Sequence, residues 1–203
     1  MARAETLLPL LPDLWWWHTF EDSVRTDLGS TAGLTEPGLL VVDPVDLAES
    51  ALEQLSGLGA WFAIVLTNGN HARAAARYRT RFNLPIFCHP GAVGELEISI
   101  DGVLEDGDLL AGMRVIELEG AGAGEIALWD ERGRLHVGDA LVNLDSTGFS
   151  VLPERYCLDR ARLGRSLRKL LPLEPKVITF AHGSPLLEGA SERLRRLIDF
   201  SED

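Results

Sequence analysis

The sequence predicts an α/β (α+β) fold in which layered sheets are covered by helices. Both ends of the chain alternate short apolar runs with segments of helical spacing, whereas residues 113–139 have a composition typical of successive strands. Because each apolar sheet face needs a covering layer, this order favours sheets packed together with helices outside them.

The N-terminal part is expected to alternate strands and helices. Residues 46–59 have leucine and alanine at helical spacing and glycine at positions 57 and 59, which favours a helix that ends there. The apolar run 38–44 is closed by Asp-Pro, and 61–66 is continuously apolar, so both are expected to be strands. The remaining expectations are strands at 14–20 and 84–90 and a helix at 71–82.

The C-terminal part continues the pattern. Residues 113–119 are expected to form a strand, and 125–139 a hairpin that turns at 131–134. Asp159 is placed to cap a helix over 159–171, because its carboxylate can accept from free N–H groups of the first turn. A strand at 176–183 and a helix from Ser191 complete the chain.

Length and charge restrict the functional classes. A chain of 203 residues fits one domain, 1–203. Acidic residues outnumber Lys and Arg by 31 to 19, and the formal charge of −12 disfavours nucleic acid and anionic membranes as partners. The arginines of 73–81 form a local basic segment, whose simpler interpretation is a solvated helix face.

Cysteine content and hydropathy indicate a cytoplasmic protein. Cys88 and Cys157 are too few for a disulfide framework and lie in apolar settings typical of buried thiols. The apolar start is broken by proline and aspartate, so we expect it to belong to the mature fold. No uninterrupted apolar run reaches the roughly 18 residues of a membrane span.

Polar residues gather where the expected strands end. The stretches are "LTNGNHAR" after residue 65, "GAGAGE" before the hairpin, "VGDAL" around Asp139 and "FAHGSP" around His182. In layered α/β folds such loops meet at one rim of a sheet, where ligands bind. A shared site at that rim is therefore expected.

The order of these pieces resembles the metallo-β-lactamase superfamily over nearly the full chain. The resemblance rests on "VVDP", "LTNGNHARAA", "GAGAGEIALWD", "HVGDAL" and "AHGSPL", in that order. It implies a four-layer αββα sandwich and one or two metal ions that activate water for hydrolysis. The family's motifs are Thr-His-x-His-x-Asp-His, Gly-His-Thr-x-Gly, a Gly-Asp with a bridging aspartate, and a final Gly-His.

Most ligand positions of that pattern are replaced in this chain. Thr67 matches the threonine, but Asn68 and Asn70 stand where two histidines are expected, and Ala72 and Arg73 stand at the aspartate and the last histidine. Ala121 falls on the histidine of the glycine-rich loop. Only Asp139 and His182 keep the ligand type, as the vestige of a metal site. The candidate pocket consists of Asn68, Asn70, His71, Arg73, Ala121, Glu125, Asp139 and His182.

The chemistry of these residues leaves two arrangements open. Asp139 and His182 alone would hold a metal weakly, because a tight site needs three or more ligands and asparagine amides are poor zinc donors. His71 could be a third ligand, but capping or packing at the helix start is the favoured interpretation. Arg73 could instead form a fork with Asp139 and neutralise it, which predicts a hydrogen bond between them; a solvated Arg73 is the alternative.

Three functions follow. The favoured one is a binding or assembly module without hydrolytic activity, with no metal cofactor, no confident catalytic residue and an unknown small molecule or protein as partner. The alternative is a hydrolase with one zinc, iron or manganese ion at Asp139 and His182, assisted by His71 or Glu125. A third is an anion pocket at a helix start near Asn70 and Arg73. The tryptophans at 15–17 are expected in the core or in a homodimer interface.

Overall fold

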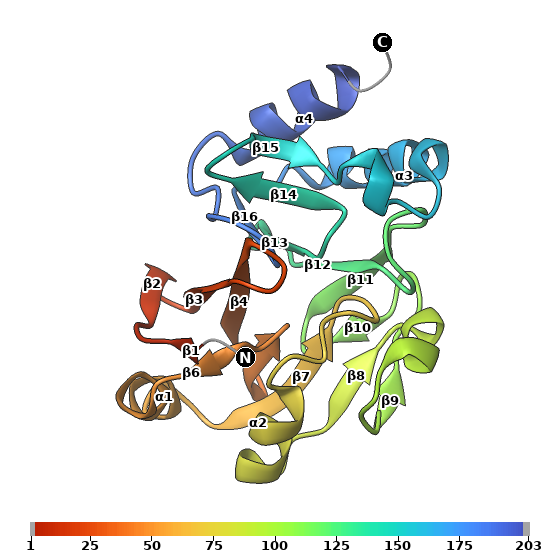
Figure 1. Cartoon of the computed structure of the whole chain (residues 1–203). Helices are drawn as coiled ribbons and strands as arrows, with labels where there is room; N and C mark the ends of the chain where they lie inside the picture. The colour runs from red at the N-terminus through yellow and green to blue at the C-terminus, as the bar shows by residue number, and fades with distance from the viewer. Residues whose placement is uncertain (1–2, 201–203) are drawn as a thin grey trace.

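Two sheets face each other, and helices cover the outer face of each (Figure 1). The computed structural model describes residues 3–200. The larger sheet has the strand order β2-β3-β4-β5-β7-β8-β9, and the smaller one has the order β10-β11-β12-β13-β16. In Figure 1, α1 and α2 lie below the larger sheet, and α3 and α4 lie above the smaller one. The predicted α/β class and its four-layer arrangement are confirmed.

The bounds of the elements are as follows. The larger sheet contains β2 (Leu8–Leu11), β3 (Leu14–Glu21), β4 (Thr26–Thr35), β5 (Gly38–Val42), β7 (Trp61–Leu66), β8 (Ile86–Cys88) and β9 (Gly102–Val103). The smaller sheet contains β10 (Leu109–Leu110), β11 (Met113–Glu117), β12 (Ile126–Trp129), β13 (Arg134–Val137) and β16 (Val177–Phe180). Two short pairs are formed by β1 (Arg3–Ala4) with β6 (Asp46–Leu47), and by β14 (Leu141–Leu144) with β15 (Gly148–Val151). The helices are α1 (Glu49–Ser56), α2 (Ala75–Phe82), α3 (Arg160–Leu167) and α4 (Ala190–Phe200), with 3₁₀ turns at Pro90–Glu95, Glu154–Tyr156 and Arg168–Leu173.

Alternation along the central strands produces three apolar layers. On β7, Ile64 and Leu66 face the core between the larger sheet and the helices α1 and α2, whereas Ala63 and Val65 face the smaller sheet. This is the two-residue period of a strand, with both faces apolar because both are covered. On the facing sheet, Leu128 points into the inter-sheet layer. A third core lies between the smaller sheet and α3 and α4.

Strand direction brings several chain segments to one edge. β5, β7 and β8 are parallel to each other, and β13 is parallel to β16, so within each group the carboxyl ends share an edge. The two edges are joined directly, since the N–H of Ile126 donates to the carbonyl of Thr67 at 2.8 Å. A second link runs from the N–H of Gly29 to the carbonyl of Ala181 at 2.7 Å. Loops that leave these strand ends therefore meet.

Most expected elements are present, and the differences have local causes. The helix expected from residue 71 begins only at Ala75, because residues 69–70 and 73–74 form turns and Arg73 has a φ of 37°. Helix α3 is capped as expected by Asp159, whose side chain accepts from the N–H of Arg162. Strand β4 was not expected, since its sequence TDLGSTAGLT is rich in small and polar residues. The tryptophans at 15–17 are buried in the chain itself.

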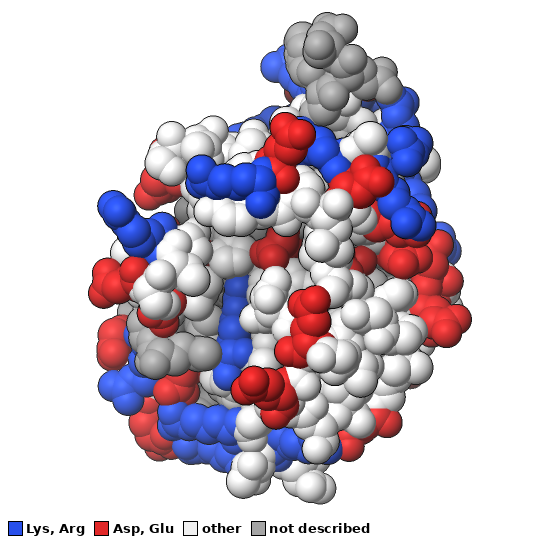
Figure 2. All heavy atoms as spheres, turned by 45° about the vertical axis from the view of Figure 1, so that its right-hand side comes forward, with Lys and Arg blue, Asp and Glu red and all other residues white. Residues whose placement is uncertain are grey.

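The surface mixes both signs of charge. On the face drawn in Figure 2, Lys and Arg side chains lie next to Asp and Glu side chains. On α2 the arginines form ion pairs, for example Arg79 with Asp101 at 2.6 Å. This agrees with the solvated-face interpretation for the residues of α2. The helices among residues 3–200 are all too short or too polar to cross a bilayer.

Candidate functional site

Three side chains from different strand ends converge at the shared edge. His71 follows β7, Asp139 follows β13 and His182 follows β16. Their ligand-type atoms all lie within 4.8 Å of one another. Asp139 Oδ1 is central, because it is 3.2 Å from His71 Nε2 and 3.0 Å from His182 Nε2.

His71 is held from behind by a buried carboxylate. Its Nδ1 lies 3.0 Å from Asp43 Oδ2 and 2.9 Å from Thr67 Oγ1. Asp43 is itself fixed, since it accepts from the N–H and the hydroxyl of Thr67 at 2.8 and 2.6 Å. Because a carboxylate only accepts, the Nδ1 of His71 must carry the proton and its Nε2 is directed toward Asp139. The expectation that His71 caps the helix was wrong, because α2 begins at Ala75 and no side chain caps it, whereas the expected packing agrees with the 2% exposure of His71.

His182 is oriented in the same way by a main-chain group. Its Nδ1 is 2.9 Å from the carbonyl oxygen of Asp27, which can only accept. The neutral imidazole therefore presents the lone pair of Nε2 to Asp139. Two nitrogen lone pairs and a carboxylate oxygen thus point at one another, an arrangement that is repulsive unless a cation lies between them.

The geometry fits one metal ion. His71 Nε2 and Asp139 Oδ1 are buried and have no hydrogen-bond partner within the described chain. Ligands about 2.1 Å from an ion lie roughly 3.0–3.4 Å from each other, which matches the separations of 3.2 and 3.0 Å between Asp139 Oδ1 and the two histidine Nε2 atoms. Two imidazoles and a carboxylate are donors suited to zinc, iron or manganese. The described residues offer one such group, so the set fits a single ion.

Without an ion, protons supply the positive charge. Burial would lower the pKa of His71, but the charges of Asp43 and Asp139 raise it to about 9. Burial would raise the pKa of Asp139, yet the charge of His71 and the close approach of both imidazoles hold it well below its usual value. The pKa of Asp43 is low because its own burial is outweighed by His71 and His136. The metal-free triad is therefore an ion-pair cluster.

Asn68 and Glu125 form the wall beside Asp139. The side-chain N–H groups of Asn68 donate to Glu125 Oε2 at 2.8 Å and to Asp139 Oδ2 at 3.0 Å. Burial, followed by the charge of Asp139, raises the pKa of Glu125 to about 8. Glu125 thus lies in the pocket, as the sequence predicts, and is 2% exposed.

Arg73 does not pair with Asp139. Its guanidinium donates to the carbonyls of Gly29 at 2.7 Å, Asp43 at 3.0 Å and Ala181 at 3.1 Å. The expected hydrogen bond to Asp139 was wrong, and so was the solvated alternative, because the side chain points inward and joins three chain segments. The anion pocket is contradicted as well, since α2 begins beyond Arg73 and carbonyls occupy this guanidinium.

The other expected positions do not contribute side-chain donors. Asn70 is exposed, and its backbone N–H donates to Asn68 Oδ1 at 2.8 Å. Ala121 is buried in the apolar core under α3. The structure thus brings together five of the eight residues named from the sequence: Asn68, His71, Glu125, Asp139 and His182.

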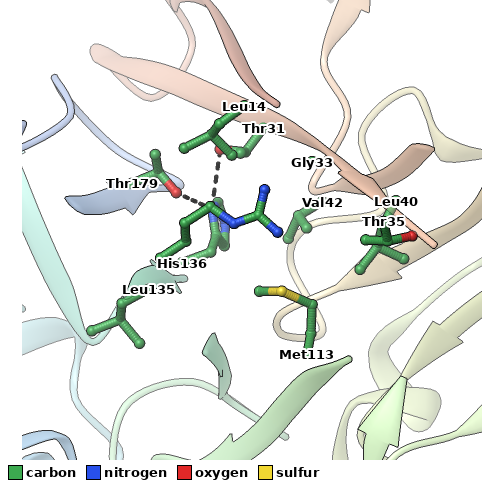
Figure 3. Close-up of a pocket in the computed structure, with 11 residues that line it drawn as sticks. Leu14, Thr31, Gly33, Thr35, Leu40, Val42, Met113, Leu135, His136 and Thr179 are labelled. Carbon is green, nitrogen blue, oxygen red and sulfur yellow. Dashed lines mark hydrogen bonds between the residues drawn. The ribbon is translucent and has the colours of Figure 1, made fainter. Parts of the chain in front are cut away.

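A second buried histidine lies behind the site. His136 Nδ1 is 2.9 Å from Thr179 Oγ1 and 3.2 Å from Thr31 Oγ1, beside a cavity of about 30 Å³ between the sheets (Figure 3). Its Nε2 is 3.5 Å from Asp43 Oδ2. These contacts give His136 a structural role behind the site. Asp43 was overlooked, although a charged residue directly after a buried strand is a signal the sequence does contain.

Comparison with known proteins places this geometry in context. A family model described as the metallo-beta-lactamase superfamily matches residues 9–200. The chain is similar to TTHA1623 in a di-iron-bound form, with 26% identity over 87% of this chain and 97% of that one, at a TM-score of 0.66. It is also similar to the metallo-beta-lactamase family protein TTHA1429 from Thermus thermophilus, with 20% identity, coverage of 96% and 81%, and a TM-score of 0.67. The DIM-1 metallo-beta-lactamase shares 12% identity over 99% of both chains, at a TM-score of 0.77. No curated protein matches the sequence.

Proposed function

The chain belongs to the metallo-beta-lactamase superfamily, and on that premise we propose that it is a hydrolase that holds one divalent transition-metal ion. His71, Asp139 and His182 would hold the ion. The observation that carries this proposal is the pair of Nδ1 contacts, to Asp43 Oδ2 at 3.0 Å and to the carbonyl of Asp27 at 2.9 Å. These contacts turn both Nε2 atoms toward Asp139 Oδ1.

The donor set supports zinc, iron or manganese. Two imidazoles and one carboxylate are the ligands of mononuclear non-haem iron sites and also suit zinc. The similar protein TTHA1623 exists in a di-iron-bound form, which makes iron a natural first ion to test. When bound, such an ion lowers the pKa of a coordinated water toward neutrality and so provides a nucleophile for hydrolysis.

The residues of the chain prepare the site for that chemistry. Asp43 keeps the proton of His71 on Nδ1, away from the site. His71 is 2% exposed, so solvent reaches the group mainly from the side of Asp139 and His182, whose side chains are 16% and 17% exposed. Three protein ligands leave positions open for water and substrate, as catalytic sites require.

A binding or assembly module without a metal is the competing function. The observation in its favour is that protons can replace the ion, because the pKa of His71 rises to about 9 beside two carboxylates. In that form Asp139 would bridge two imidazoles as a closed ion-pair cluster. The two proposals differ in whether the folded protein takes up an ion.

Metal analysis separates the two functions. The protein is purified without chelator after growth with added iron, zinc and manganese, and bound metal is measured by mass spectrometry and by titration of stripped protein. We expect about one equivalent per chain, lost in His71→Ala and His182→Ala. His89→Ala is the matched control, because His89 Nδ1 accepts from the N–H of Gly91 outside the triad. A stripped wild-type protein that takes up none of the three ions would favour the binding module.

A further inference from the structure

We propose that Asn68 and Glu125 act together as a clamp that fixes Asp139 in the orientation needed to bind the ion. The proposal rests on the proposed function above, because it concerns the affinity of that metal site. In it Asn68 is a positioning residue, although it stands where the family pattern has a ligand.

The amide of Asn68 has only one orientation that satisfies its neighbours. Its Oδ1 accepts from the N–H of Asn70 at 2.8 Å, so its Nδ2 must face the opposite side. There it donates to Glu125 Oε2 and to Asp139 Oδ2, at 2.8 and 3.0 Å. Because Asn68 is fully buried, both N–H groups need these acceptors. The lone pair of its amide nitrogen is delocalised and not available to a metal, and its oxygen already accepts from the N–H of Asn70.

Glu125 holds Asp139 by a second route. Its Oε1 accepts from the N–H of Ala140 at 2.9 Å, and Ala140 directly follows Asp139. Glu125 thus fixes the backbone next to Asp139 directly and the carboxylate of Asp139 through Asn68. Each of its two oxygens has a protein donor, which supports a positioning role for Glu125 rather than metal ligation.

The chain before Asp139 is pressed against the same groups. A Cβ on Gly138 would lie 2.5 Å from Thr67 Oγ1 and 2.7 Å from Glu125 Oε1, so a larger residue would displace one of them. The backbone at 138–140 is therefore packed against the clamp and bonded to it. With Oδ2 of Asp139 held by Asn68, Oδ1 is left facing the two histidines.

Chemistry distinguishes the clamp from simple burial of polar groups. A change at Asn68 or Glu125 removes no metal ligand, yet it frees Asp139 to rotate away from His71 and His182. Groups that orient a ligand typically change metal affinity about 10- to 100-fold. Residues that act as one unit also show non-additive effects.

The test is a double-mutant cycle in metal affinity. Dissociation constants for Co²⁺ and Zn²⁺ are measured for wild type, Asn68→Ala, Glu125→Ala and the double variant, each shown to be folded by circular dichroism. We expect each single change to weaken binding about 10- to 100-fold, and the double variant to lose little more than the worse single one. The Co²⁺ absorption spectrum should change, because coordination by Asp139 changes.

Asn70→Ala is the matched control. It removes a neighbouring amide but keeps the backbone N–H that bonds Asn68 Oδ1, so affinity and spectrum should stay at the wild-type values. If Asn68→Ala does not fold, Glu125→Gln is measured in its place. The glutamine oxygen can still accept from the N–H of Ala140, but its NH₂ group then faces Asn68 Nδ2, so the hydrogen bond from Asn68 is lost.

The outcomes separate this inference from the proposed function. Wild type that binds an ion, together with folded variants of unchanged affinity and spectrum, would overturn the clamp alone, even if the variants were less stable. Equal losses in Asn70→Ala and Asn68→Ala would overturn it as well. Wild type that binds no ion would overturn both proposals.

Discussion

The loop after β7 and the turns after β13 and β16 contribute to the same site by different routes. The two turns keep Asp139 and His182 at the positions where the family pattern expects ligands. The loop has asparagines at its first two ligand positions and supplies His71, one residue out of register. Because Asp43 holds the ring of His71 from behind at 3.0 Å, a supporting carboxylate can orient an imidazole toward the site where the family motif is replaced.

The largest expected effect tests the side of the site that keeps the family pattern. Asp139→Ala removes the oxygen that lies 3.0 and 3.2 Å from the two imidazoles, so metal affinity should fall by on the order of a thousandfold. Isothermal titration with Zn²⁺ measures this. If Asp139→Ala still binds Zn²⁺ with wild-type affinity, Asp139 is not a ligand.

A smaller effect is expected from the support of the loop. Asp43→Asn keeps the shape but removes the charge that accepts from Thr67 and His71. Metal affinity should drop about 10- to 100-fold, because Nδ1 of His71 loses its fixed proton acceptor. The same titration on Asp43→Asn and Asp139→Ala compares the loss of affinity from removing the support of His71 with the loss from removing a proposed ligand. An unchanged constant would mean that His71 does not depend on Asp43.

The pH dependence should also single out the loop histidine. In the metal-free protein the pKa of His71 is raised to about 9 by Asp43 and Asp139, so metal binding must expel its proton. Affinity should rise roughly tenfold per pH unit up to about pH 9. The stability of the metal-free protein should change in the opposite sense, so its free energy of unfolding should fall as the pH rises.

The stabilising contribution of the His71 imidazolium is complete below the unfolded pKa of about 6.5. It is lost as the pH rises through the folded pKa of about 9.

Urea unfolding and metal titration from about pH 6 to pH 9.5 measure the two trends. The same titration on His71→Ala is the control, and its stability curve should lose the decline. The number of protons released on metal binding, measured in two weak buffers, gives an independent value for the pKa of His71. A flat affinity profile in wild type would show that His71 is neutral before the ion arrives.

The smallest effect on metal affinity is expected from Arg73, which links the chain segments at Gly29, Asp43 and Ala181 and does not contact the proposed ligands. Arg73→Met removes three hydrogen bonds to main-chain carbonyls, although Ala181 keeps the N–H of Gly29 and Asp43 keeps the hydroxyl of Ser30 as donors. The free energy of unfolding should therefore fall by about 3 kcal/mol, roughly 1 kcal/mol for each bond lost. Metal affinity of the folded protein should change by less than about threefold. Arg77→Met, which loses only the exposed pair with Asp46, serves as control and should cost under about 1 kcal/mol. A large loss of affinity with little loss of stability would place Arg73 in the site itself.

Apolar periodicity was sufficient to predict much of the fold, because strands such as β7 and helices such as α1 carry their burial pattern in the local sequence. The sequence missed β4, whose small and polar residues are buried by tertiary contacts alone. In the site, Asp139 and His182 were identifiable from position. The orientation of His71 was not, because it depends on Asp43, which precedes it by 28 residues. Arg73 was misplaced because its partners are main-chain carbonyls, which no side-chain pattern reveals.

The site at the shared strand edge is complete only when the two halves of the chain are assembled. His71 belongs to one sheet, whereas Asp139 and His182 belong to the other, so neither half possesses a complete set of donors. If the ion binds as proposed, occupancy at a thousandfold excess over the dissociation constant would add about 4 kcal/mol to the cost of separating the halves. Two fragments produced by cutting the chain between β9 and β10 should then reunite more tightly with the ion than without it, and colour from bound Co²⁺ would appear only on their reunion.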